Sequence, residues 1–278
     1  MATSAGAEVT AGRRAPGWHR RVRDGSTLVA PVAAVLVVLG LWELVVRAGV
    51  ISETSIPTMS ATVSELFGQL GEGDFWSAVG KTLEGWALGL GIAMALGIPL
   101  GMLIGSSRWL FRAFRVPIEF LRPIPSVALI PLAVLIYGTG LESKVFLAAF
   151  ASFWPMLIQT IYGVQDVDPV ATDTAKSFGL GRLARVRHIT LPSAVPYIAT
   201  GVRISSAVSL ILVVTAELVI GSPGLGRQIN VARSGGNLEV MYALILATGL
   251  LGYVLNIVAS AAERRVLRWH PSQRQVTA

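Results

Sequence analysis

Three long stretches of this chain, 85–107, 145–165 and 240–262, contain no charged residue. A helix needs about 20 mainly apolar residues to cross the hydrocarbon core of a bilayer. Each stretch is long enough for one crossing, and only 14% of the whole chain is charged, against about a quarter in an ordinary soluble protein. The sequence therefore predicts a protein that is folded inside a membrane.

The hydropathy pattern predicts an all-α, polytopic protein with about six transmembrane helices. The third and fifth expected spans are the weaker ones, because prolines interrupt the third and Glu217 interrupts the fifth. The prolines are Pro123, Pro125 and Pro131, and we expect them to bend or break their helix. The expected spans are 28–46, 83–106, 118–138, 143–164, 196–220 and 241–262.

The distribution of Lys and Arg predicts the orientation. If the N-terminus is cytoplasmic, the inside segments hold 17 of the 23 Lys and Arg, the outside segments hold five, and Arg122 lies within a span. Cytoplasmic loops carry the excess of positive charge. We therefore expect a multi-pass protein of the cytoplasmic membrane with both termini inside. It has a basic tail at 1–26, a transmembrane domain at 27–266 with a cytoplasmic loop at 165–195, and a second tail at 267–278. The basic tail also resembles a secretion signal, but its apolar run is long enough to span and no convincing cleavage site follows.

Small residues recur at every fourth position of the second expected span. One face of that helix is therefore nearly smooth, and a neighbouring backbone can approach it closely, which is the main route to helix association in lipid. The pattern predicts tight helix packing along the whole span. The residues are Gly85, Gly89, Ala93, Gly97, Gly101 and Gly105.

Common catalytic and metal-binding motifs are absent from the sequence. There is no cysteine, and no phosphate-binding loop of the form G-x-x-x-x-G-K-[ST]. His19, His188 and His270 all fall in expected cytoplasmic segments, away from any intramembrane serine or metal cluster. The sequence therefore predicts no catalytic residue, no metal site and no cofactor bound by this chain. The net charge of +7 does not indicate nucleic acid, since the charges cluster at the ends of apolar runs.

Three residues are candidates for lining a transport pathway: Arg122, Pro125 and Glu217. A charge inside a span costs about 3 kcal/mol on insertion scales, so such a residue usually faces the bundle interior. Glu217 is nearly alone in its apolar surroundings. A helix broken by proline is tolerated at membrane depth where it packs on protein or lines a watery cavity. Arg122 either extends its head to the interface or attracts an anion, and both interpretations stay open.

The cytoplasmic loop carries clear helix signals. Asp168 and Pro169 are typical of an N-cap and a first helical residue, and Gly179 is typical of a C-cap. A second, basic helix is expected to start at residue 180 or 181 and to run to about 190. Leu191 and Pro192 are then expected to break the chain before the fifth span. The loop is predicted to be a short helix across the cytoplasmic face, suited to docking a partner.

The loop resembles the E-A-A loop of ABC importer permeases. Asp173-Thr174-Ala175 is followed after three residues by Gly179, and after nine more by I-x-L-P. Asp replaces the usual Glu and Thr the first Ala. The segments "PIPSVALIPLAVLIYGTG" and "AELVIGSPGLGRQI" are similar to the nitrate/sulfonate/taurine permease subfamily, and the resemblance covers roughly residues 35–265.

The resemblance implies a type I ABC importer permease fold and an assembly. Two permease copies, as a homodimer, would form the pathway through the lipid bilayer. Two ATPase subunits, which carry ATP-Mg, would dock on the two loops, and an extracytoplasmic binding protein would deliver the substrate. The implied substrate is a small anion such as a sulfonate, taurine or nitrate. The residues implied in coupling to the ATPase are Asp173, Thr174, Ala175, Lys176, Gly179, Arg187, Leu191 and Pro192.

Two other classes compete with this interpretation. A gradient-driven secondary transporter would have inverted repeats and paired acidic residues at the membrane midplane, and the sequence offers neither. A membrane enzyme would need the catalytic constellations that are absent above.

Overall fold

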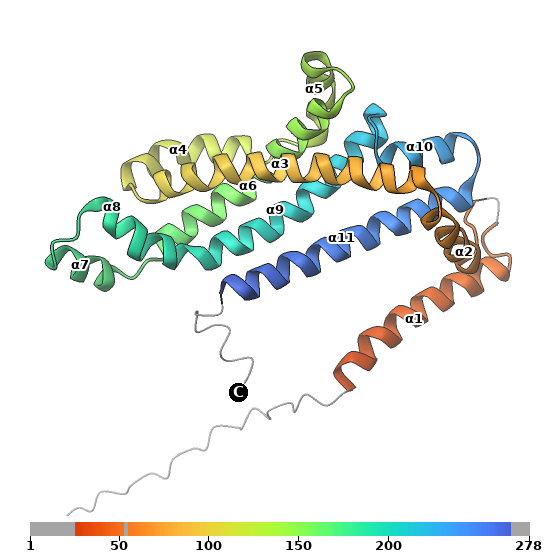
Figure 1. Ribbon diagram of the computed structural model, residues 1–278, viewed down its shortest axis with the longest axis horizontal. Coiled ribbons are helices and arrows are strands. Elements are labelled where there is room, and N and C mark those ends of the chain that lie inside the picture. Colours follow the sequence, from red (N-terminus) through yellow and green to blue (C-terminus); the bar gives the residue numbers. More distant parts are fainter. Residues whose placement is uncertain (1–25, 53–54, 268–278) are drawn as a thin grey trace, which may run out of the picture.

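The computed structural model describes residues 26–52 and 55–267, and most of the two predicted tails lies outside them. The regular elements of the described chain are all helical, as predicted (Figure 1). In chain order they are α1 (Ser26–Arg47), α2 (Met59–Leu70), α3 (Gly73–Gly105), α4 (Arg108–Leu121), η1 (Ser126–Leu129), α5 (Ile130–Tyr137), α6 (Leu141–Gln165), α7 (Pro169–Ser177), α8 (Arg182–Arg185), η2 (Val186–Thr190), α9 (Leu191–Ile220), α10 (Leu225–Ser234) and α11 (Leu238–Val266).

The described chain holds four helices that are long and apolar enough to cross a membrane, or five if a bent pair counts as one span. The four are α3, α6, the continuous Arg182–Ile220 helix and α11, and the bent pair is α4 with η1–α5. The expectation of about six spans is thus met only in part. Helix α1, with 22 residues, coincides with the first expected span but is not among these helices. Some of its side chains lie outside the described residues.

The third expected span, 118–138, is not one helix. Helix α4 begins ten residues earlier, at Arg108, ends at Leu121, and meets η1–α5 at an angle of 80°. Pro123 and Pro125 lie in the break, where their missing N–H groups and fixed backbone prevent a continuous helix. Figure 1 shows the result: α5 stands away from the bundle, while α4 lies alongside α3.

The glycine face of α3 packs closely on another helix, as the sequence predicts, and the structure shows that its partner is α6. A Cβ atom built on Gly89 would lie 2.6 Å from the Cβ of Ala148, and one on Gly101 would lie 2.6 Å from the Cβ of Thr160. No side chain fits in either gap. The two helices therefore touch backbone to side chain along their length, which suits association in lipid.

Helix α9 is tied to α6 and α3 by hydrogen bonds between side chains and backbone. Ser152 donates to the carbonyl of Ser205 at 3.1 Å, and Ser205 donates back to that of Ser152 at 2.8 Å. Trp86 on α3 donates to the carbonyl of Ser206 at 3.0 Å, and Ser209 donates to that of Trp86 at 3.1 Å. These reciprocal pairs satisfy buried hydroxyl groups while they join the three central helices.

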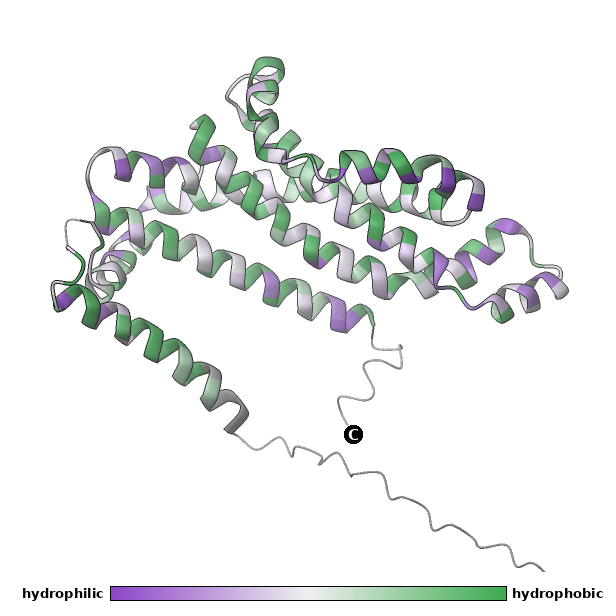
Figure 2. Cartoon of the chain, turned by 180° about the vertical axis from the view of Figure 1, so that it is seen from behind, coloured by the Kyte–Doolittle hydropathy of each residue, from purple (hydrophilic) through white to green (hydrophobic). Residues whose placement is uncertain are grey.

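Polar and apolar residues are separated along the bundle. Figure 2 shows mostly apolar colouring on α1, and polar residues gathered on α7, α8 and the end of α11. The exposed apolar side chains of α1 include Val37 at 68% and Leu44 at 66%. Exposed apolar area of this extent is suited to lipid or to another helix.

Candidate functional site

Helix α7 begins and ends as the sequence predicts. The carboxylate of Asp168 accepts a hydrogen bond from the N–H of Val170 at 2.8 Å, and Pro169 is the first helical residue. Gly179 adopts the left-handed conformation, with φ +74°. Its N–H bonds to the carbonyl of Lys176 at 2.9 Å, and the next N–H, from Leu180, bonds to that of Ala175 at 3.0 Å. This is a glycine-dependent helix stop, and a side chain at residue 179 would strain it.

The expected break at Leu191 and Pro192 is wrong. Helix α8, η2 and α9 form one continuous helix of 39 residues from Arg182 to Ile220. The reason is the π-turn of η2, in which the N–H of Leu191 reaches back five residues to the carbonyl of Val186. This wider turn gives the proline ring, which has no N–H, a place inside the helix. The part of the 165–195 loop from Arg182 onward is therefore continuous with a long apolar helix that is able to span a membrane.

The predicted coupling residues lie mostly on the surface of this segment. Ala175 is buried, while Asp173 and Lys176 are exposed and form an ion pair at 2.8 Å. Thr174, Gly179 and Arg187 are also exposed, and Leu191 and Pro192 lie at the entrance to α9.

Sequence reasoning missed three apolar side chains in the same segment. Val170 is 71% exposed, Phe178 is 81% exposed and Leu183 is 82% exposed. Large apolar groups so exposed, on a segment otherwise rich in charge, are typical of a surface that a partner covers. The sequence offered one sign that Phe178 is exposed, because this residue immediately precedes Gly179, the glycine that ends α7.

Glu217 is not alone, contrary to expectation. Its carboxylate is fully buried and lies 2.7 Å from the ammonium of Lys144 on α6. It also accepts hydrogen bonds from the hydroxyl of Thr82 at 2.8 Å and from the N–H of Gly226 at 3.1 Å. Lys144 in turn donates to the carbonyls of Lys81 and Pro223, at 2.9 and 2.8 Å. The ion pair thus joins α3, α6, α9 and the start of α10, and every contact satisfies a buried charge.

Two glycines make room for this ion pair. A Cβ atom at Gly224 would lie 2.0 Å from the carboxyl carbon of Glu217, and φ there is +153°. A Cβ atom at Gly226 would lie 2.3 Å from the carbonyl oxygen of Val214. These contacts give a physical reason for the glycines in "GSPGLG", residues 221–226. The sequence alone did not pair the motif with Lys144, which is 73 residues from Glu217.

Arg122 and Pro125 lie at the exposed break between α4 and η1. Arg122 lines a cavity of about 560 Å³ between α4 and α6, together with Arg115 and Tyr162. Arg115 is paired with Glu119 at 2.8 Å, whereas no ion pair of Arg122 occurs among the described residues. Glu217 is not in this cavity, so the structure does not bring the three pathway candidates together.

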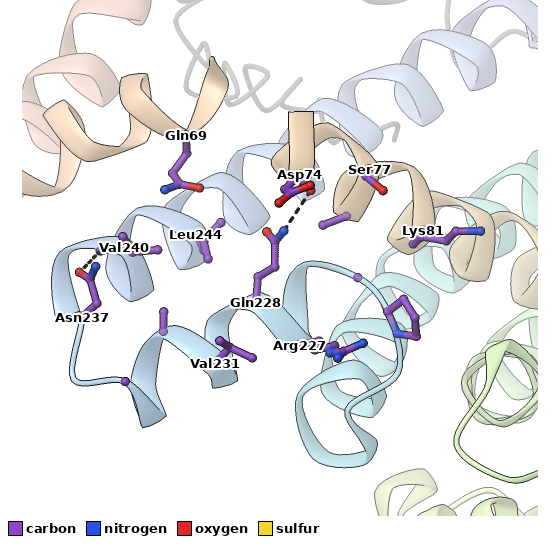
Figure 3. Close-up of a pocket in the computed structure, with 15 residues that line it drawn as sticks. Gln69, Asp74, Ser77, Lys81, Arg227, Gln228, Val231, Asn237, Val240 and Leu244 are labelled. Atoms are coloured by element: carbon purple, nitrogen blue, oxygen red, sulfur yellow. Dashed lines mark hydrogen bonds between the residues drawn. The ribbon is translucent and has the colours of Figure 1, made fainter. Parts of the chain in front are cut away.

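A second cavity of about 560 Å³ lies between α2, α3, α10 and α11 (Figure 3). Figure 1 shows α2 and α10 at the opposite end of the bundle from α7 and α8. Lys81 and Arg227 line this second cavity, and Gln228 closes one side by donating to the carbonyl of Asp74 at 3.0 Å. Across the described chain, no group of three or more His, Cys, Asp or Glu is arranged to hold a metal ion.

Comparison with known proteins identifies the family. Residues 97–268 match the family model described as "Binding-protein-dependent transport system inner membrane component". The chain belongs to this family. It is therefore a multi-pass inner-membrane permease of a binding-protein-dependent ABC importer, a transport subunit rather than an enzyme. Of the transporter classes weighed above, family membership selects the ABC importer.

Named relatives extend over nearly the whole permease. The taurine transport system permease protein TauC of Escherichia coli (strain K12) is 30% identical over 244 residues, 86% of this chain and 89% of that protein. The nitrate import permease protein NrtB of Leptolyngbya laminosa is 29% identical over 265 residues, 92% of this chain and 94% of that protein.

A solved structure supports the fold. The inward-facing MetNI methionine ABC transporter matches with a TM-score of 0.61 at 20% identity, over 68% of this chain and 94% of that one. This likeness confirms the ABC importer permease fold.

Proposed function

We propose that two copies of this permease form the pathway of an ATP-driven importer for a small sulfonate- or nitrate-like anion. An ATPase subunit that carries ATP-Mg docks on each 165–195 loop, and a binding protein delivers substrate at the opposite face. The substrate class is supported by the names of the relatives, a taurine and a nitrate permease.

The proposed coupling role rests on one observation: a continuous helix joins the 165–195 loop to the membrane-spanning part of α9. Helix α7 presents Phe178 at its end, and the 39-residue Arg182–Ile220 helix begins three residues after Gly179. A partner that holds Leu183 pulls directly on a membrane helix, because Leu183 lies inside the continuous Arg182–Ile220 helix, and Phe178 lies only four residues before that helix. The loop therefore acts as a lever, with Ala175 and Gly179 setting its shape and Thr174, Lys176 and Arg187 facing the partner.

The orientation follows from charge. The end of the bundle with α7 and α8 carries Lys176, Arg182, Arg185 and Arg187, and the last turn of α11 adds Arg264 and Arg265. An excess of positive charge favours the cytoplasmic side. Both termini are then cytoplasmic, and the cavity between α2, α3, α10 and α11 faces outward toward the binding protein.

The break between α4 and η1 is the proposed approach for the anion. Arg122 supplies a cation without an ion pair in the described chain, at the edge of a cavity, and Pro125 maintains the irregular backbone beside it. Glu217 contributes from outside this cavity, by fixing the helices that frame the pathway.

Uptake by the complete transporter tests the substrate proposal. The permease, its ATPase and its binding protein are reconstituted in vesicles, and ATP-dependent uptake of radiolabelled taurine and nitrate is measured. We expect uptake of one of them, and Arg122→Gln to reduce its rate roughly tenfold, since a charge-assisted contact contributes about 1.5–3 kcal/mol. Arg122→Lys should restore part of the rate. Arg115→Gln is the matched control, because Arg115 is already neutralised by Glu119. Uptake of neither anion would contradict the proposal.

A further inference from the structure

The largest cavity described here lies at the end of the molecule that bears α7 and α8. It has a volume of about 1070 Å³, just above the range of about 300–1,000 Å³ that is usual for ligand sites. Its walls come from the ends of α3 and α6 and from α4, α7, α8 and η2. Figure 1 shows the turn between α3 and α4 at the same end as α7 and α8. We call it the basic cavity.

The walls of the basic cavity carry cations and no acidic residue. The charged residues that line it are Arg108, Arg112, Lys176, Arg182 and Arg185, with no Asp or Glu among the lining residues. Lys176 is partly neutralised by Asp173 at 2.8 Å. No ion pair of the four arginines occurs within residues 26–52 and 55–267. Like charges gathered around one space repel each other unless an anion enters it.

One donor in the cavity is poised for such an anion. The Nε of Arg185 is buried and has no hydrogen-bond partner in the described chain. A buried donor without a partner costs free energy, about 1–3 kcal/mol and more when the group is charged. Hydroxyl groups of Ser107, Thr172 and Thr190 also line the cavity. Arginine forks and hydroxyls together are the usual ligands of a phosphate group.

The edge of the cavity carries apolar groups suited to lipid. Trp109, next to Arg108, is 74% exposed, and Leu103 in the cavity wall is 58% exposed. Exposed tryptophan beside arginine is typical of the level of the lipid headgroups. Basic pockets between membrane helices on the cytoplasmic side bind anionic headgroups.

We propose that the basic cavity binds the phosphate headgroup of an anionic phospholipid of the inner leaflet, with the acyl chains along Leu103 and Trp109. Its depth in the membrane rests on the proposed orientation, but anion binding does not depend on transport or on its substrate. The lipid would brace the turn between α3 and α4 against α7 and α8, which belong to the 165–195 loop.

Native mass spectrometry of the purified full-length chain in neutral detergent tests this proposal. The probes are dioctanoyl phosphatidylglycerol, dioctanoyl phosphatidylcholine and sodium phosphate. We expect phosphatidylglycerol to bind at one site per chain and phosphatidylcholine to bind at least tenfold more weakly. Arg112→Gln with Arg185→Gln should weaken phosphatidylglycerol binding at least tenfold. The matched control is Arg264→Gln with Arg265→Gln, which removes the same charge from the exposed end of α11 and should leave binding unchanged.

Three results would overturn the proposal. Equal binding of both lipids would exclude recognition of an anionic headgroup. If the Arg264→Gln, Arg265→Gln control loses phosphatidylglycerol binding to the same extent, binding depends on general electrostatic attraction and not on the basic cavity. Displacement of the lipid by an equal concentration of sodium phosphate would reassign the cavity to a free anion. Size-exclusion chromatography checks the folding of the double variant. If it aggregates, Arg185→Gln alone must weaken binding about threefold while Arg185→Lys retains it.

Discussion

At the scale of single residues, the buried pair of Lys144 and Glu217 organises the half of the bundle that lies away from α7 and α8. Removing two charges from water costs several kcal/mol per ion, and the pair recovers this only through close geometry and further hydrogen bonds. The structure supplies both, with an ion-pair distance of 2.7 Å and a hydrogen bond to Glu217 from Thr82. We infer that the pair fixes how α6 meets α9, and that each charge needs the other.

This interdependence predicts non-additive substitutions. Lys144→Met or Glu217→Gln alone should lower the free energy of unfolding by about 3–5 kcal/mol, because each leaves one buried charge unpaired. The double variant should lose less than the sum of the two, since it leaves neither Lys144 nor Glu217 as an unpaired buried charge. Unfolding of the purified permease in detergent, followed by circular dichroism, measures all four proteins. Losses that simply add would mean that the two side chains act separately.

At the scale of elements, the small residues of α3 determine where α6 can lie. A side chain at Gly101 would overlap Thr160, whereas Gly91 on the same helix has no atom within 4 Å of a Cβ position. The repeat at every fourth residue predicted close helix packing from the sequence alone, without the identity of the partner helix. It did not predict that α4 would bend by 80° into η1–α5, because proline indicates a break but not its angle.

The two glycines form a matched pair for a stability test. Gly101→Ala should destabilise the permease by about 1–3 kcal/mol, the usual cost of overpacking. Gly91→Ala should be neutral or stabilise it by about 0.5–1 kcal/mol, because alanine favours a helix. Thermal unfolding in detergent compares the stability of the Gly101→Ala and Gly91→Ala proteins. A Gly101→Ala protein as stable as its Gly91→Ala counterpart would show that α3 and α6 have room to move apart.

At the scale of the whole molecule, the sequence predicted the class of fold, the helical loop and its glycine stop. The class of fold is predicted from charge and hydropathy summed over many residues, so a few residues that depart from the pattern do not change the prediction. Long-range geometry escaped prediction, as Lys144 and Glu217 show, because no local pattern links positions far apart in the chain. The prediction at Pro192 was wrong for a different, local reason: proline usually ends a helix, and the π-turn just before it permits continuity here.

We propose that the ATPase moves the membrane helices through its contact with the 165–195 loop. Co-purification of the ATPase with the tagged permease tests it most directly. Phe178→Ser removes an anchor that is 81% exposed and should reduce the bound ATPase roughly tenfold or more. Phe67→Ser makes the same change on α2, at a side chain that is 69% exposed, and should retain it. When equal amounts of monodisperse permease are compared, loss of the bound ATPase in Phe178→Ser but not in Phe67→Ser supports coupling through the 165–195 loop. Full recovery of the ATPase by Phe178→Ser, or equal loss in both variants, would contradict it.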